Sequence, residues 1–533
     1  MDNIWCPPGT SATLPARGGS QLRKIAAPFV VDPPAGVRIR TRLRPTDAEA
    51  HALRMIGEHL GHLYRTDLVG RVVLGRVPAT ERRWTERKRN LTRLCSSRWA
   101  GAITRATEDQ YQLAMRGLVS EVSSLRSATA ALQHRIAAPV GQKIGGNRGY
   151  NSEMERFQKT RRLAQLLDRL AVAQEALAAG RPTIAVGSRR LWKTRNHLDA
   201  ANLTRDDWDR QWSAARMFLA ADGESGQIGG NLTIRVTAAG ILSVKVPAPL
   251  VPELGNHLVL STPVTFNRRT EEWADRVTDR RCIRYEISYV TSRGRWYVDA
   301  SWGCGDMPVL GLEVLQLSGV VGVDMNADHL AACHLDASGN PVGAPVTIRL
   351  DLAGQNAGTR DGRLRSAITA LLDVARDAGA TTIAIENLNF QDARDTGRET
   401  MGRGVHGKRF RRTVHGIPTA KFRNRLVSMA TNRGLHVIAV DPAYTSKWGG
   451  QHWQKPLQTS GGTVTRHHAA SVAIGRRALG CKIRRREDGP RTRQRTGAGQ
   501  PSPRPHRAPE GAAITTGLVR PAATSRLGPP GTS

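Results

Sequence analysis

The sequence is poor in acidic residues and lacks paired cysteines and long apolar runs. It has 79 Lys and Arg against 45 Asp and Glu, and no carboxylate occurs between Asp441 and Glu487. No run of about 18 apolar residues is present, which excludes a membrane-spanning helix. None of the six cysteines forms a C-x-x-C pair, so no zinc ribbon is encoded and we expect no bound zinc. The N-terminus has no secretory signal pattern, and with unpaired cysteines this predicts a cytoplasmic protein.

The charge balance points to a polyanionic partner. The formal net charge is +34 over 533 residues, and the sequence pI is about 11.2. Such a field attracts nucleic acid, because neutralising phosphates releases counterions. The alternative is a soluble basic enzyme without a polyanionic partner, and a membrane surface is a weaker alternative still. The chain length predicts about three domains.

The periodicity divides the chain into parts of different secondary structure. Alternation from Val37 to Leu43 predicts a strand, and Pro45-Thr46-Asp47 predicts a helix start. Hairpins are predicted around Ala239-Gly240 and Arg293-Gly294-Arg295. We therefore expect a multidomain α+β and α/β protein. Its predicted parts are a flexible N-terminus (1–35), a β-rich part (36–45 plus 229–312), a helical part (46–228), an α/β part (313–481) and a disordered basic tail (482–533).

A basic helix is predicted between Glu81 and Trp99. One interpretation is a solvated surface with Trp84 and Trp99 packed inward. The other is a phosphate-facing helix whose aromatic side chains stack on bases or ribose. On the second interpretation the nucleic-acid contacts come from Arg82, Arg83, Arg87, Lys88 and Arg89.

Three segments near the C-terminal side bring carboxylates to the ends of predicted strands. V-V-G-V-D delivers Asp324, and T-T-I-A-I-E-N-L-N delivers Glu386. A third strand ends in V-D-P-A-Y-T-S and leads to T-R-H-H-A-A, which opens an apolar helix. An acid at the end of a buried strand is costly unless it is paired or binds a cation.

Together these segments resemble the split RuvC nuclease domain of TnpB (OrfB) insertion-sequence proteins and of the compact type V CRISPR effectors. The match spans about Gly319 to Gly480. The resemblance implies an RNase H-like fold for residues 313–481. It also implies a β-barrel-like wedge domain interrupted by a helical recognition domain, and a degenerate zinc-ribbon loop at 447–464.

The resemblance assigns metal-binding roles to two acids. Asp324 matches the first catalytic carboxylate and Glu386 the second, and in the family three carboxylates hold two Mg²⁺ ions. Hard cations prefer such oxygen ligands. Mg²⁺ or Mn²⁺ is therefore the implied cofactor, with its binding weakened by the departure at the third position.

The third carboxylate of the family pattern is missing. Aligning on Ala469-Ala470 places Arg466 at the aspartate position, and shifting the alignment places His467 or His468 there. Imidazole is a poor Mg²⁺ ligand. Asp441 is a candidate substitute, although we interpret it as a turn residue before Pro442.

A basic segment, Arg398 to Arg425, lies between the second and third segments. It has nine Lys and Arg against one Glu, and we expect it to contact nucleic acid or to act as a lid. A solvated charge run is the alternative. Its candidate contact residues are Lys408, Arg409, Arg411, Arg412, Lys421 and Arg423.

The resemblance and the missing acid together predict an RNA-guided DNA-binding protein. Its partners would be a guide RNA and double-stranded DNA, with sequence read by base pairing and with weak or no cleavage. The alternative is an active metal-dependent endonuclease of a transposon, completed by Asp441 or a histidine. A decayed transposon reading frame is a third hypothesis. A cut-and-paste transposase is disfavoured because the helix that should carry its third acid has none.

Overall fold

We describe a computed structural model, in which the described residues are 24–77, 82–144, 147–305, 309–388, 418–458 and 463–483. All of the described residues belong to one compact unit, which ends at Arg484. Of the predicted basic tail (482–533), residues 484–533 lie outside the described residues. Lys408, Arg409, Arg411 and Arg412 also lie outside them. Within the described ranges, no helix combines the length and the apolar character needed to cross a membrane.

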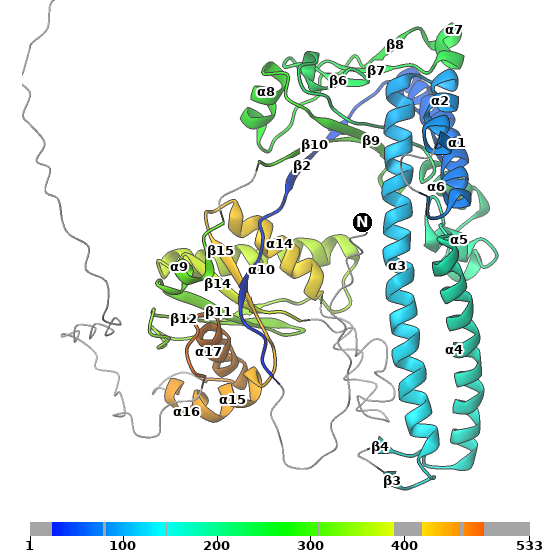
Figure 1. The fold of residues 1–533 in the computed structure, drawn as a ribbon. Coiled ribbons are helices and arrows are strands. Elements are labelled where there is room, and N and C mark those ends of the chain that lie inside the picture. The colour runs from blue at the N-terminus through cyan, green and yellow to red at the C-terminus, as the bar shows by residue number, and fades with distance from the viewer. Residues whose placement is uncertain are drawn as a thin grey trace, which may run out of the picture. The chain divides into compact units, whose positions relative to one another are not determined.

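Long helices make up the N-terminal half (Figure 1). They are α1 (Asp47–Leu74), α2 (Arg82–Leu94), α3 (Ser97–Ala137) and α4 (Glu153–Ala179). A capping box of Thr46 and Glu49 starts α1, as the sequence predicts. Within the predicted helical part, α1 ends before Gly75, and the hydroxyl of Ser96 accepts a hydrogen bond from Trp99 N where α3 begins. α3 and α4 pack together as a hairpin, joined through β3 (Lys143–Ile144) and β4 (Asn147–Arg148).

A β-rich part follows the short helices α5 (Arg189–Thr194) and α6 (Arg205–Ala214). One sheet has the order β2-β10-β9-β5, and the other has the order β6-β7-β8. Strand pairing confirms both predicted hairpins, β6 with β7 and β9 with β10. The strand that contains Val37, β2, pairs with β10 and so belongs to the β-rich part. The bounds are β2 (Gly36–Leu43), β5 (Ala220–Ala221), β6 (Ile234–Val236), β7 (Leu242–Lys245), α7 (Val251–Leu254), β8 (His257–Val259), α8 (Thr270–Thr278), β9 (Arg284–Val290) and β10 (Arg295–Gly303).

Two expectations for this part need correction. β5 pairs with β9 although residues 46–228 were assigned to the helical part, so the β-rich part begins before residue 229. Among the described strands neither sheet closes on itself, because β5 is only two residues long and ends its ladder. The β-barrel-like closure is therefore not present in these sheets.

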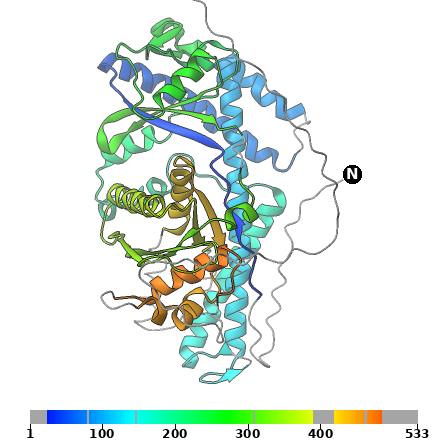
Figure 2. The ribbon, with the colours of Figure 1, turned by 90° about the vertical axis from the view of Figure 1, so that its left-hand side faces the viewer.

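The third part is a six-stranded sheet with helices on both faces (Figures 1 and 2). Its order is β1-β15-β14-β11-β12-β13, with β11, β14 and β15 parallel. The other neighbours pair antiparallel. The strands are β1 (Phe29–Val30), β11 (Val320–Met325), β12 (His329–Leu335), β13 (Val346–Arg349), β14 (Thr382–Glu386) and β15 (His436–Val440).

Alternate residues of the central strands face two separate cores. Val321 and Ile383 pack with α10 (Ala357–Asp377) and α14 (Thr419–Thr431). Val320 and Ala384 pack on the opposite side with α17 (Arg466–Ala478). The remaining helices of this part are α9 (Leu312–Gln316), α15 (Thr445–His452) and α16 (Gln454–Leu457). A sheet buried on both faces explains why its strands read as continuous apolar runs.

Two local predictions for this part are wrong. Residues 1–35 are expected to be flexible, and of these the structure describes 24–35. There Phe29 and Val30 pair with β15 and complete its open edge, so this part of the expectation is corrected. The segment 447–464 was expected to be a loop, yet most of its described residues lie in α15 and α16. Gly449 lets α15 approach the backbone of Ala469 on α17 closely enough to pack.

Candidate functional site

Strand register brings the two predicted acids together. β11 and β14 are parallel neighbours, and Val323 is paired with Ile385. The next residue on each strand is Asp324 and Glu386, so both carboxylates reach the same edge of the sheet. The Asp324 side chain is only 7% exposed. The site thus places two acids, separated by more than sixty residues of sequence, at adjoining strand ends.

Glu386 is held in an environment that disfavours its charge. Burial raises the pKa of Glu386 to about 7, and the negative charges of Asp324 and Asp441 act in the same direction. A hydrogen bond donated by Thr445 Oγ1 and the positive charge of Arg477 oppose this shift without cancelling it. A carboxyl group poised near neutral pH is typical of a functional site.

His467 is the residue at the third position that reaches the acid pair. Its Nδ1 lies 2.8 Å from Asp324 Oδ2, and this hydrogen bond raises the pKa of the imidazole. Since the carboxylate can only accept, Nδ1 carries the proton. Arg466, one residue earlier on α17, is exposed. Of the three candidates on α17 that the sequence left open, Arg466, His467 and His468, His467 is the one whose side chain contacts Asp324.

His468 instead has a structural role. Its Nδ1 accepts a hydrogen bond from Thr465 N, while Thr465 Oγ1 accepts from His468 N, which together form a capping box that begins α17. Because Nδ1 accepts, Nε2 carries the proton and donates to Thr347 Oγ1 at 2.7 Å. Burial lowers the pKa of His468, in keeping with this neutral tautomer. His468 therefore fixes α17 against β13 and is not directed at the acids.

Asp441 has backbone partners of its own. Its carboxylate accepts from Ala443 N at 2.9 Å and from Ala26 N at 3.0 Å. The first contact is the turn role that its position before Pro442 predicts. Its charge nevertheless acts on Glu386, so it lies near the pair.

Three further residues complete the site and were missed by the sequence reasoning. Asn326 Nδ2 donates to Asp324 Oδ2 at 3.1 Å and lies 3.3 Å from His329 Nε2. His329 Nδ1 lies 2.8 Å from Asp328 Oδ1, and the His329 ring packs edge-on against His467 at 5.1 Å between ring centroids. The run N-A-D-H, which begins two residues after Asp324, was the available signal.

This arrangement does not fit a two-ion magnesium site. Asp324 Oδ2 already accepts from both His467 and Asn326. Within the described ranges, no group of three or more His, Cys, Asp or Glu is arranged to hold a metal ion. The two acids alone offer ligands for a single hard cation at best, and imidazole would suit a different metal.

Lys421 and Arg423, the two predicted contact residues of the Arg398–Arg425 segment that are described, differ in position. Arg423 Nη1 donates to Asn387 Oδ1 at 2.7 Å, next to Glu386, and both Arg423 and Glu386 line a cavity of about 550 Å³. Lys421 Nζ pairs with Asp361 Oδ1 at 2.8 Å and is half exposed. Arg423 is thus the one placed beside the acids.

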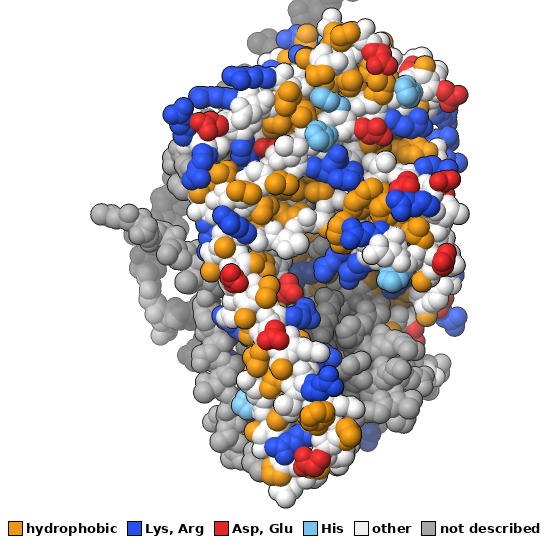
Figure 3. Space-filling view, turned by 90° about the vertical axis from the view of Figure 1, so that its right-hand side faces the viewer, with side chains coloured by type: hydrophobic (Ala, Val, Ile, Leu, Met, Phe, Trp, Pro, Cys, Tyr) orange, Lys and Arg blue, Asp and Glu red, His pale blue; other side chains and the backbone are white. Residues whose placement is uncertain are grey.

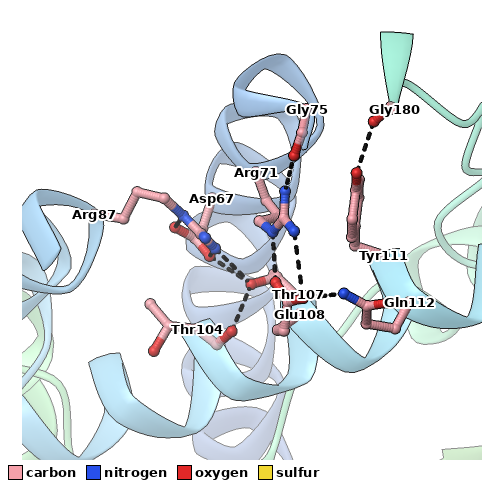
Figure 4. A network of polar contacts seen from close by, with 10 residues as sticks. All are labelled: Asp67, Arg71, Gly75, Arg87, Thr104, Thr107, Glu108, Tyr111, Gln112 and Gly180. Atoms are coloured by element: carbon pink, nitrogen blue, oxygen red, sulfur yellow. Dashed lines mark hydrogen bonds and ion pairs between the residues drawn. The ribbon is translucent and has the colours of Figure 1, made fainter. Parts of the chain in front are cut away.

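On α2 the structure separates one predicted contact residue from the others. Arg87 is bound by both carboxylate oxygens of buried Asp67 and by Thr107 Oγ1, in the network of Figure 4. These contacts hold the Arg87 guanidinium within the helical part, so it is less available to a phosphate than the exposed residues of α2. Arg82, Arg83, Lys88 and Arg89 are exposed. Trp99 is fully buried and donates to Lys245 O, so it is a core residue.

A groove of about 990 Å³ runs along α2 and α3. Lys88 and Arg89 line it together with Arg98 and Arg105, which the sequence did not single out. Arg98 pairs with Glu224 and Arg105 with Asp222, so carboxylates occupy part of this basic lining. On the face shown in Figure 3, Lys and Arg side chains lie among hydrophobic ones.

Comparisons with known proteins give a weak structural likeness. No protein-family model and no curated protein matches the sequence. Among solved structures, the chain is similar to T. thermophilus RuvC in complex with a Holliday junction substrate, with 15% identity and a TM-score of 0.22. The match covers 31% of this chain and 94% of that chain. Strand register and contacts, rather than this likeness, carry the interpretation of the site.

Proposed function

We propose that the protein is an RNA-guided DNA-binding protein of the TnpB and type V effector lineage that binds target DNA with weak or no cleavage. One observation carries the proposal. Asp324 and Glu386 lie on adjoining strand ends, and the residue that meets them from α17 is His467 where the family has an aspartate. The binding surface of a nuclease site is retained while one of its three carboxylates is replaced by a hydrogen-bond donor.

The topology supports an RNase H-like fold for this part. The strands β11, β12 and β13 form an antiparallel meander, and β14 and β15 add in parallel on the other side of β11. This is the order that the resemblance to the RuvC domain implies. The excess of 34 positive charges supports a nucleic-acid partner. Guide RNA is inferred from the sequence motifs alone.

The alternative, an active Mg²⁺- or Mn²⁺-dependent endonuclease, is favoured by one observation. Asp441 lies near enough to raise the pKa of Glu386. If Asp441 left its two backbone donors, it could supply the third carboxylate. Its bonds to Ala443 N and Ala26 N argue against this, because a buried carboxylate gives up such donors only at a cost.

The test uses the full-length protein with the RNA that co-purifies. That RNA is sequenced, and matched and mismatched duplexes are offered with Mg²⁺ or Mn²⁺. We expect sequence-dependent retention of the matched duplex with little scission, and increased Mg²⁺-dependent scission for His467→Asp. Scission by the unaltered protein that Asp324→Ala abolishes would establish the alternative. Absence of a discrete RNA would overturn RNA guidance.

A further inference from the structure

A row of three tryptophans lies on α5 and α6, away from the acid pair in sequence. Ser188 caps α5 and Thr204 caps α6 through their hydroxyl groups. Trp208 is buried, and its Nε1 donates to Leu191 O at 2.9 Å. Trp208 therefore fastens α6 to α5 and serves as the anchor of the row.

The indole rings continue from this anchor toward the surface. Trp208 and Trp212 lie one helical turn apart on α6 and stack with ring centroids 5.2 Å apart and an interplanar angle of 16°. Trp212 and Trp192 follow at 6.3 Å and 30°. Trp192 is 47% exposed. The row thus begins in the core and ends with a large ring open to solvent.

An arginine guanidinium lies over each of the three indole rings. The Cζ atom of Arg195 lies 3.9 Å from the centroid of Trp192. Arg216 and Arg205 lie at 4.9 Å from Trp212 and 5.4 Å from Trp208. A guanidinium over an indole holds a flat cationic surface in place, and such a surface stacks on an unpaired base.

The charges around Trp192 are not compensated locally. On α6, Asp209 pairs with Arg205 and Asp207 with Arg210. The exposed residues Arg189, Arg190 and Lys193 have no carboxylate partner in the described part of the chain. Arg189 and Lys193 lie one turn apart on α5, beside Trp192. The exposed ring is therefore flanked by free cations suited to phosphates.

We propose that this surface, formed by Trp192, Arg195, Arg189, Arg190 and Lys193, binds single-stranded nucleic acid by stacking an unpaired base on the Trp192–Arg195 pair. Internal packing explains Trp208, which is buried and hydrogen-bonded. It does not explain Trp192, which leaves nearly half of its surface in water within a cationic patch. A ring presented in this way suits a partner with both flat aromatic groups and negative charge, and unpaired nucleotides have both.

The test separates base stacking from phosphate binding. Full-length protein is freed of co-purifying nucleic acid, and its affinity is measured by fluorescence anisotropy for labelled oligothymidylate, oligouridylate and an abasic oligonucleotide with the same number of phosphates. We expect Trp192→Ala to weaken binding of the base-bearing strands about tenfold and to leave binding of the abasic strand unchanged. Comparison of the two base-bearing strands shows whether DNA or RNA is preferred.

Two variants act as controls. Trp192→Phe keeps an aromatic face and should retain most of the affinity. Arg190→Ala should weaken the base-bearing and abasic strands equally and reduce the salt dependence of both. Far-UV circular dichroism checks that each variant is folded. Equal affinities of the wild-type protein and Trp192→Ala for the base-bearing strands would overturn the proposal, as would equal loss for the abasic strand.

This inference does not depend on the function proposed for the acid pair. The assay contains no guide, no duplex and no divalent cation, and it compares substitutions at Trp192 and Arg190 only, with the acid pair left intact. Failure of stacking at Trp192 therefore leaves the proposal for Asp324 and Glu386 intact, and the reverse also holds.

Discussion

Glu108 and Glu386 are both partly or fully buried, but their surroundings shift the pKa values of the two carboxyl groups in opposite directions. Burial alone would raise the pKa of Glu108 on α3, but hydrogen bonds from Arg71 and Gln112 and the charges of Arg71 and Arg87 outweigh it and lower the pKa. Burial raises the pKa of Glu386 to about 7. Thr445 is its one side-chain hydrogen-bond donor among the described residues, and Asp324 and Asp441 add negative charge. The same chemical group is ionised in one place and poised in the other.

This difference in pKa shift separates buried acids that stabilise the fold from buried acids that indicate a functional site. The carboxylates of the helical network, Asp67 and Glu108, have cationic partners that hold α1, α2 and α3 together. In the sheet, the acids face one another at the strand ends, and the nearest counter-charges, His467 and Arg477, compensate them only in part. A buried carboxylate that lacks full compensation by cations or hydrogen-bond donors destabilises the fold. Its presence therefore indicates a functional position.

The largest expected effect comes from breaking the compensated network. Arg87→Ala would leave Asp67 as a buried unpaired charge and should destabilise the helical part by about 3–5 kcal/mol. Arg82→Ala, five positions away on the same helix, removes only the exposed pair with Glu86 and should cost less than about 1 kcal/mol. Urea unfolding followed by far-UV circular dichroism measures both. Similar small losses for the two variants would show that Asp67 is not buried as described.

Local patterns predicted elements well, but they did not predict which side of an element meets a distant partner. The helix bounds of α4 and the turn at Gly240 follow from glycine stops and period. Arg87 and Lys88 are equivalent in sequence, and only the position of Asp67 on another helix separates them. The acids were predictable because each ends its own strand.

The third position could not be fixed from sequence because it depends on the phase of α17. A shift of one residue turns a helical side chain by about 100°, so Arg466, His467 and His468 were equivalent in an alignment. The phase is set by Thr465, which caps α17, and by His468, which binds Thr347 on β13. The Thr465 cap depends on local backbone geometry, and the His468–Thr347 hydrogen bond depends on a residue far away in sequence. Neither can be read from the spacing of apolar residues.

A second prediction tests the packing that brings His467 to Asp324. A Cβ atom at Gly322 of β11 would collide with the backbone of Ser471 and would lie 2.8 Å from Gly475 N on α17. Gly322→Ala should therefore push α17 from the sheet and cost about 1–3 kcal/mol. Gly362→Ala on α10 meets nothing within 4 Å and should instead stabilise by about 0.5–1 kcal/mol.

Thermal unfolding of both glycine variants provides the measurement. In addition, the Gly322→Ala protein should lose the elevated pKa of His467, read from its imidazole NMR signal, because α17 no longer presents the ring to Asp324. A stable Gly322→Ala protein with an unchanged His467 signal would contradict the close approach of α17 and β11.

The smallest expected effect concerns the contrast between the two glutamates. A carboxyl whose folded pKa is raised holds its proton more tightly in the folded state, so its contribution to stability is lost as the pH rises from about 4.5 through about 7. Gln cannot ionise, so Glu386→Gln should gain stability relative to the wild-type protein across this window, by up to about 3 kcal/mol and less where solvent screens the site. Glu108 has a lowered folded pKa, so its contribution is lost as the pH falls.

The two variants should therefore diverge in opposite directions. With rising pH, Glu386→Gln becomes more stable relative to the wild-type protein, and Glu108→Gln becomes less stable as Glu108 ionises below about pH 4.5. Melting temperatures of each variant and of the wild-type protein, measured in EDTA between acid and neutral pH, give both stability differences. The hydrogen bond lost in each variant changes stability by the same amount at every pH, so it does not affect how the difference varies with pH. A Glu386→Gln difference that stays flat from pH 5 to 8 would mean that Glu386 is solvated, and would remove the desolvated acid pair from the site.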